Sequence, residues 1–245
     1  MQERRKIYTS FHDLSPSEYM YFPKGTLEMG KKGSFSRLEL SHITTAMMIL
    51  IMCFTFTLSL NNLLWSYMNG FNIYRFQQGF ILSLIAVFCA FFFHEMSHKL
   101  TAQHYRLWSE FRMNLKSLLI SLTLSITTGF VFAAPGAVMF RGEPRLFEQG
   151  HIALAGPLAN IILASIFTPV YLTYFTDSIG LIPEMIGFIC LINIVFGSFN
   201  LLPFKSFDGY KVIQWNKYVW SIMIMYSLIL FLIITPFIPK LLPIY

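Results

Sequence analysis

The chain has 245 residues, of which 55% are hydrophobic and only 12% are charged, and its mean hydropathy is +0.57. This composition excludes an ordinary soluble domain, because a soluble core does not need so much apolar surface, and it indicates an integral membrane protein. The net charge of +6 does not indicate nucleic-acid binding, since no basic stripe interleaved with aromatic residues is present, and membrane orientation explains it better.

Residues 1–42 are expected to form a polar extension on the cytoplasmic side, because they carry seven of the chain's eighteen basic residues. Residues 43–245 are expected to form a membrane-embedded domain. Its apolar stretches that are long enough to be considered as spans are 43–65, 79–93 with its continuation, 117–136, 152–175, 185–204 and 218–239.

The second apolar stretch continues into the sequence HEMSH, which places His94, Glu95 and His98 inside an expected membrane-spanning helix. Ionisable residues at such a depth indicate a functional site, because their burial in hydrocarbon is unfavourable unless something binds them. One helical turn separates His94 from His98, so both imidazoles can reach one Zn²⁺ ion while Glu95 activates a bound water. The spacing therefore predicts a catalytic zinc site, and such a site needs a third protein ligand.

Residues 117–136 are apolar enough for a spanning helix, but the charge pattern argues against one. If all the apolar stretches spanned, Lys205, Lys211 and Lys217 would lie outside the cell, against the positive-inside rule. If this segment instead enters the membrane and returns, or forms strand and irregular backbone against protein, the basic loops share the cytoplasmic side. We therefore expect a mostly α-helical polytopic protein with about five to six transmembrane helices and a short β or re-entrant segment between the first two core helices.

The expected third zinc ligand is Asp208, which in the re-entrant topology emerges on the same side of the membrane as His94. The alternative is His104, because HEMSHKLTAQH matches the spacing HExxHxxGxxH except for Thr101 at the glycine position. Thr101 does not permit the sharp turn that glycine permits, and on a continuing helix His104 lies about 9 Å along the axis from His98. The sequence therefore favours Asp208.

Three motifs, HEMSH, GPLAN and NLLPFKSFDG, occur in that order. With them the chain resembles the site-2 protease family of intramembrane zinc metalloproteases over residues 79–213, in a prokaryotic form without a PDZ or CBS domain. Phe207 stands where the family usually has leucine, which is a small departure. The resemblance implies that one Zn²⁺ is held by His94, His98 and Asp208, and that Glu95 is the catalytic acid and base.

The resemblance also implies roles for two asparagines. Asn200 is expected to bind the substrate backbone or to polarise its carbonyl. Asn160 is a weaker candidate for substrate binding, since a polar residue beside Gly156 and Pro157 is equally typical of helix packing in a membrane.

The expected partners are a transmembrane protein substrate and the lipid bilayer of the cell membrane, with the active site near the cytoplasmic side. A helical substrate must unwind before its peptide bonds can be attacked. Strand addition to residues 137–140 is our hypothesis for binding the unwound segment, with Ala137 and Val138 as contacts. Two alternatives remain open: a transporter or metal permease that uses the same His and Asp cluster, and an inactive relative that retains zinc.

Overall fold

The computed structural model describes residues 33, 35–131, 135–141, 144–178 and 180–238. Most of them are helical, and five helical segments are long and apolar enough to cross a membrane. These segments are Arg37–Asn69, Ile73–His104, Leu146–Tyr174, Leu181–Asn200 and Lys217–Phe237. The expectation of a mostly α-helical polytopic membrane protein is therefore confirmed.

The helical elements, in chain order, are α1 (Arg37–Leu58), α2 (Leu63–Asn69), α3 (Ile73–Val87), the π-helical segment η3 (Phe88–Phe92), α4 (Phe93–His104), α5 (Leu115–Thr128), α6 (Leu146–Tyr174), α7 (Leu181–Asn200), α8 (Asp208–Trp215), α9 (Lys217–Ile234) and the 3-10 turn η4 (Thr235–Phe237). The strands are β1 (Trp108–Met113) and β2 (Gly136–Arg141).

The first span begins earlier than expected. Ser36 is the N-cap of α1, and its hydroxyl accepts a hydrogen bond from the Glu39 backbone N–H at 3.1 Å. A serine in this position satisfies one of the free donors at a helix start. The helix thus includes residues 37–42, while the rest of the predicted polar extension falls almost entirely outside the described residues.

The segment after the HEMSH helix runs along α1 and comes back to the sheet. Its helix α5 has 14 residues, or about 21 Å, which is short of the roughly 30 Å hydrocarbon thickness. At its far end, the Thr57 hydroxyl of α1 donates to the Gly129 carbonyl at 2.8 Å. At its near end, the chain pairs again, because the Asn114 N–H donates to the Pro135 carbonyl at 2.8 Å. The described part of this segment thus leaves β1 as a helix and is paired with the end of β1 again at Pro135, while its expected re-entry into a membrane stays a prediction.

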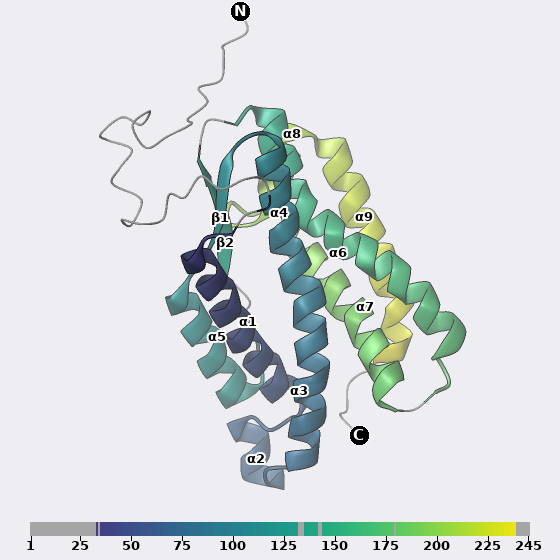
Figure 1. Ribbon diagram of the computed structural model, residues 1–245. Helices are drawn as coiled ribbons and strands as arrows, with labels where there is room; N and C mark the ends of the chain where they lie inside the picture. Colours follow the sequence, from purple (N-terminus) through teal and green to yellow (C-terminus); the bar gives the residue numbers. More distant parts are fainter. Residues whose placement is uncertain (1–32, 34, 132–134, 142–143, 179, 239–245) are drawn as a thin grey trace, which may run out of the picture.

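The two strands form an antiparallel sheet in which Phe111 pairs with Val138 and Arg112 with Ala137. The sheet lies beside α4 at the end of the molecule that also holds α8, whereas α2 lies at the opposite end (Figure 1).

The helices form two groups on either side of α4 (Figure 1). One apolar core joins α1, α5 and β1 to the α3–α4 segment, with Leu50, Phe91 and Phe111 among its buried side chains. A second core joins α6, α7 and α9 around residues such as Ile194 and Leu230. Because α4 also packs against α6, the HEMSH residues lie at the seam between the two groups.

Candidate metal centre

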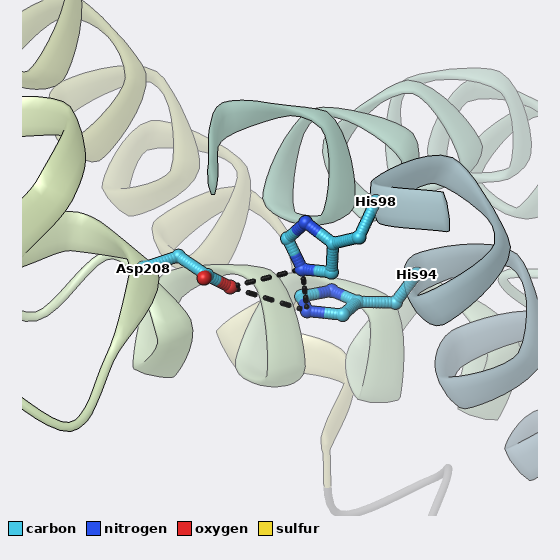
Figure 2. Close-up of side chains that lie close together, drawn as sticks. All are labelled: His94, His98 and Asp208. Atoms are coloured by element: carbon cyan, nitrogen blue, oxygen red, sulfur yellow. Dashed lines mark hydrogen bonds and ion pairs between the residues drawn. The ribbon is translucent and has the colours of Figure 1, made fainter. Parts of the chain in front are cut away.

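His94 and His98 come from adjacent turns of α4, and Asp208 is the first residue of α8. Figure 2 shows the two imidazoles and the carboxylate directed at one point. The Asp208 Oδ2 atom lies 3.5 Å from His94 Nε2 and 3.0 Å from His98 Nε2, and the two Nε2 atoms lie 3.0 Å apart. Within the described part of the chain, these residues are the one group of three or more His, Cys, Asp or Glu side chains close enough to hold a metal ion together.

The spacing of these atoms fits a tetrahedral zinc site. Ligand atoms about 2.0–2.1 Å from Zn²⁺ at tetrahedral angles lie roughly 3.3–3.4 Å from one another. The observed separations of 3.0, 3.0 and 3.5 Å bracket this value. Three ligand atoms on one face of such a tetrahedron leave the fourth position for water, which is the arrangement of a catalytic rather than a structural zinc site.

The hydrogen bonds of the two histidines fix which nitrogens carry protons. His94 Nδ1 contacts Asn160 Oδ1 at 2.6 Å, and His98 Nδ1 contacts the Ile152 carbonyl at 2.7 Å. Both partners are acceptors only, so each Nδ1 must be protonated, and each neutral imidazole then presents a lone pair at Nε2. Two lone pairs and a carboxylate facing one another repel unless a cation lies between them. The donor set therefore fits a divalent metal ion.

A buried amide network determines the orientation of Asn160. Its Nδ2 donates to the Ala90 carbonyl at 2.8 Å and to Asn193 Oδ1 at 2.9 Å, and the Asn193 Nδ2 donates to the Ile189 carbonyl at 2.9 Å. Since every donor meets an acceptor, only one orientation of each amide satisfies the network, and it presents Asn160 Oδ1 to His94. Such an outer partner fixes the tautomer and the ring orientation of a metal-binding histidine.

Ala90 belongs to the π-helical segment η3, one turn before the motif. In a regular α-helix its carbonyl would accept from the N–H four residues later. Here the carbonyl accepts a hydrogen bond from the Asn160 side chain. Single π turns of this kind are frequent at functional sites, and side chains that insert into the helical ladder produce them.

Two glycines allow the ligands to come together. A methyl group at Gly156 of α6 would lie 2.3 Å from His98 Nε2 and 2.7 Å from His94 Nε2. A methyl group at Gly209 would lie 2.0 Å from the Leu201 carbonyl oxygen. The first glycine lets α6 approach the imidazoles, and the second lets the chain after α7 fold back closely enough to direct Asp208 at them.

The charge state of Asp208 suits a metal ligand. Burial by itself favours the neutral acid, but positive charge at the Nε2 atoms of His98 and His94, whether from a proton or from a bound metal ion, holds the pKa of this carboxyl well below its usual range. Lys211, one turn later in α8, lies 3.8 Å from the other carboxylate oxygen of Asp208. The carboxylate is therefore ionised, with one oxygen directed at the histidines and the other near a lysine.

Glu95 lies beside this cluster in a cavity of about 100 Å³ that it lines together with the two histidines and Asp208. Its side chain is buried, and its Oε2 atom has no hydrogen-bond partner within the described structure. The cavity has room for a few water molecules but not for an α-helix, which is about 10–12 Å wide with its side chains. A buried carboxylate beside a cavity with room for water is suited to proton transfer.

The predicted substrate contacts lie in different places. Asn200 lines the cavity and donates to the Phe196 carbonyl at 3.0 Å, which leaves its amide a second N–H. Asn160 is fully buried and contacts His94 Nδ1, while its role in substrate binding stays a prediction. Ala137 and Val138 both line the cavity from β2.

The alternative ligand His104 lies at the C-terminal end of α4, exposed and packed against Tyr105. It is outside the cluster that could hold a metal. Sequence reasoning missed Asn193 and the Ile152 carbonyl. Asn193 is an isolated polar residue in an apolar helix, which could have marked it, whereas a backbone carbonyl leaves no signal in a sequence.

The chain is similar to a protein of Methanocaldococcus jannaschii that is named "putative zinc metalloprotease". The two are 41% identical over 145 residues, which is 59% of this chain and 75% of that protein. No family model matches the chain. No solved structure matches it either.

Proposed function

The chain belongs to a family of zinc metalloproteases, and we propose that it is an intramembrane protease of the site-2 type, which cleaves transmembrane segments of other membrane proteins. One observation carries this proposal: two histidines with fixed tautomers and an ionised aspartate converge at zinc-ligand spacing beside a buried glutamate. The histidines and the glutamate belong to a segment long enough to span a membrane. An intramembrane ionisable cluster of this kind is functional rather than structural.

The residues of the site have separate roles. His94, His98 and Asp208 hold one Zn²⁺, which when bound polarises a carbonyl and makes a water molecule acidic, with a pKa of about 7. Glu95 accepts a proton from the attacking water while the water oxygen forms a bond to the carbon of the scissile carbonyl. The C–N bond then breaks, and Glu95 passes the proton to the leaving nitrogen.

The substrate binds as an extended segment. The cavity admits a few waters and a peptide backbone but not a helix, so the transmembrane substrate unwinds at the cleavage site. β2 supplies one wall and pairs with the segment by strand addition. Asn200 and Lys211 also line the cavity, where an amide N–H and a cation are suited to the oxygen of the attacked carbonyl.

The site opens toward the cytoplasm in this proposal. His98 precedes the end of its span by six residues, or about 9 Å, so the metal lies below one membrane surface. The connections at that end carry Arg106, Lys116, Arg145, Lys205 and Lys217. At the opposite end, residues 59–72 and 175–180 carry no Lys or Arg, and Arg75 in the first turn of α3 is the nearest basic residue. Because basic residues favour the cytoplasmic side, the metal end is the cytoplasmic end of a protein of the cell membrane.

The test is peptide-bond cleavage by the purified protein in detergent, with and without a zinc chelator. We expect cleavage of a transmembrane substrate to require zinc, and Glu95→Gln to reduce it about 10³-fold while the zinc content stays at that of the wild type. Zinc binding without any cleavage by the wild type would instead identify an inactive relative, and zinc movement into vesicles would identify a permease.

A further inference from the structure

A second pair of buried charges lies next to the metal centre. Lys99 follows His98 directly in α4, and its ammonium group forms an ion pair with Glu39 of α1. Glu39 is 0% exposed and Lys99 is 1% exposed. The aromatic ring of Phe35 covers the lysine, with its centroid 4.2 Å from Nζ. A buried ion pair contributes little net stability because both groups lose their hydration, so its presence within an apolar membrane protein calls for another role.

The ion pair also holds β1. The Oε1 atom of Glu39 accepts a hydrogen bond from the Phe111 backbone N–H at 2.9 Å, while Oε2 contacts Lys99. The Lys99 carbonyl in turn accepts from the Ser109 hydroxyl of the same strand at 3.2 Å. Glu39 thus occupies the outer edge of β1 in the way that a neighbouring strand would.

This contact determines which peptide groups of β2 face the cavity. In an antiparallel pair of strands, the pairs of facing residues alternate. One pair exchanges hydrogen bonds, and in the next pair both residues point their N–H and C=O groups away from the other strand. The Phe111 N–H points to Glu39, so its partner Val138 points its own N–H and carbonyl away from β1. The Asn114 N–H donates to the Pro135 carbonyl, so this pair is one of those that exchange hydrogen bonds, as the alternation requires. Val138 therefore directs its N–H at the Glu95 carboxylate and its carbonyl toward the cavity, where a substrate segment would lie.

We propose that Glu39 and Lys99 are positioning residues, which fix β1 against α1 and α4 so that the edge of β2 away from β1 lies at the correct distance from the metal site and Glu95 for an extended substrate. This inference rests on the proposed proteolytic function. Glu39 sets the lateral position of the strand through Phe111, and Lys99 ties that position to the same helix turn that carries His98.

Two paired variants separate this role from simple stabilisation. Glu39→Gln with Lys99→Gln removes both charges but keeps an amide oxygen for the Phe111 N–H and a neutral contact between the two side chains. Glu39→Leu with Lys99→Met also removes both charges and in addition leaves the Phe111 N–H without an acceptor. The two variants differ mainly in whether residue 39 can accept the hydrogen bond from β1. Zinc content and thermal midpoint in detergent are measured for both.

We expect the Leu/Met variant to raise KM for a transmembrane substrate about five- to tenfold, the typical worth of one net hydrogen bond, with kcat and zinc content unchanged. The Gln/Gln variant should stay within about twofold of the wild-type KM. Equal KM values for the two variants, or a change in kcat alone, would overturn the proposal.

Two further measurements keep the test decisive. If the Leu/Met variant does not fold, Glu39→Asp serves instead, because it keeps the charge but withdraws the carboxylate by one methylene; an unchanged KM would then refute the proposal. Hydrogen exchange at Phe111 needs no activity, and it should be faster in Leu/Met than in Gln/Gln. Wild-type protein that never cleaves a substrate would refute the proposed function, whereas identical exchange in both variants would refute the positioning role.

Discussion

His98 and Lys99 are consecutive residues of one helix, yet they belong to two buried charged clusters of opposite kind. Lys99 meets Glu39, and this cluster contains its own cation. His98 meets His94 and Asp208, and this cluster presents two lone pairs and a carboxylate but no cation among its members. The comparison teaches that burial of charge alone does not mark a metal site. What marks it is a set of donors that cannot satisfy one another.

The largest effect that tests this comparison is expected from Asp208→Asn. The change removes the one negative charge of the metal cluster, so zinc per chain should fall to background and cleavage by about 10³-fold or more. Elemental analysis of the purified protein measures the first, and a cleavage assay the second. The matched control is the Glu39→Gln, Lys99→Gln pair, which neutralises the other cluster and should keep its zinc. Loss of zinc in the control would show that the clusters are not independent.

A smaller effect is expected from Gly156→Ala, because the added methyl would lie within 3 Å of both Nε2 atoms. The imidazoles must move by a fraction of an ångström or more, and misplacement on this scale costs about 10²-fold in rate. Gly79→Ala is the control, since a methyl there lies 3.2 Å from Ser59, far from the metal. Similar rates for both variants would contradict the close packing of α6 on the histidines.

Asn160→Leu should weaken zinc binding by about 10- to 100-fold, the usual cost of losing a partner that orients a metal ligand. Asn193→Leu should cost less, because it acts on His94 only through Asn160. Competition with a calibrated zinc chelator measures both affinities. If Asn193→Leu proves the more damaging of the two, the order of residues in the network is wrong.

The smallest effect is expected in β2, the strand whose position depends on the Glu39–Lys99 ion pair. Val138→Pro removes a backbone N–H that points to the cavity, whereas Ala137→Pro removes one on the side of β1. We expect Val138→Pro to raise KM about tenfold or less and to keep the thermal midpoint, while Ala137→Pro lowers the midpoint. Kinetics and unfolding in detergent separate the two results, and a lowered midpoint for Val138→Pro would contradict the assigned register.

The sequence predicted the elements whose signals are local. HEMSH identified the histidines and Glu95 because helical spacing brings the two imidazoles to one face with Glu95 next to them, and the charge pattern predicted that the loop bearing Asp208 lies at the same membrane surface. It did not predict that α5 is helical, because Ser and Thr among Leu suit either conformation. Nor did it predict Glu39, whose partners lie 60 and 72 residues away. Contacts at such separations depend on packing that a single sequence does not display.

The π turn at Phe88–Phe92 has a consequence for the two ends of its helix. Each residue of an α-helix advances the chain by about 100° around the axis. Removing one residue from this turn would restore a regular helix but swing α4 by that angle relative to α3. The imidazoles could then face the metal site only if α3 turned its lipid-facing side toward the protein interior. The extra residue therefore lets α3 and α4 each keep its own packing partners.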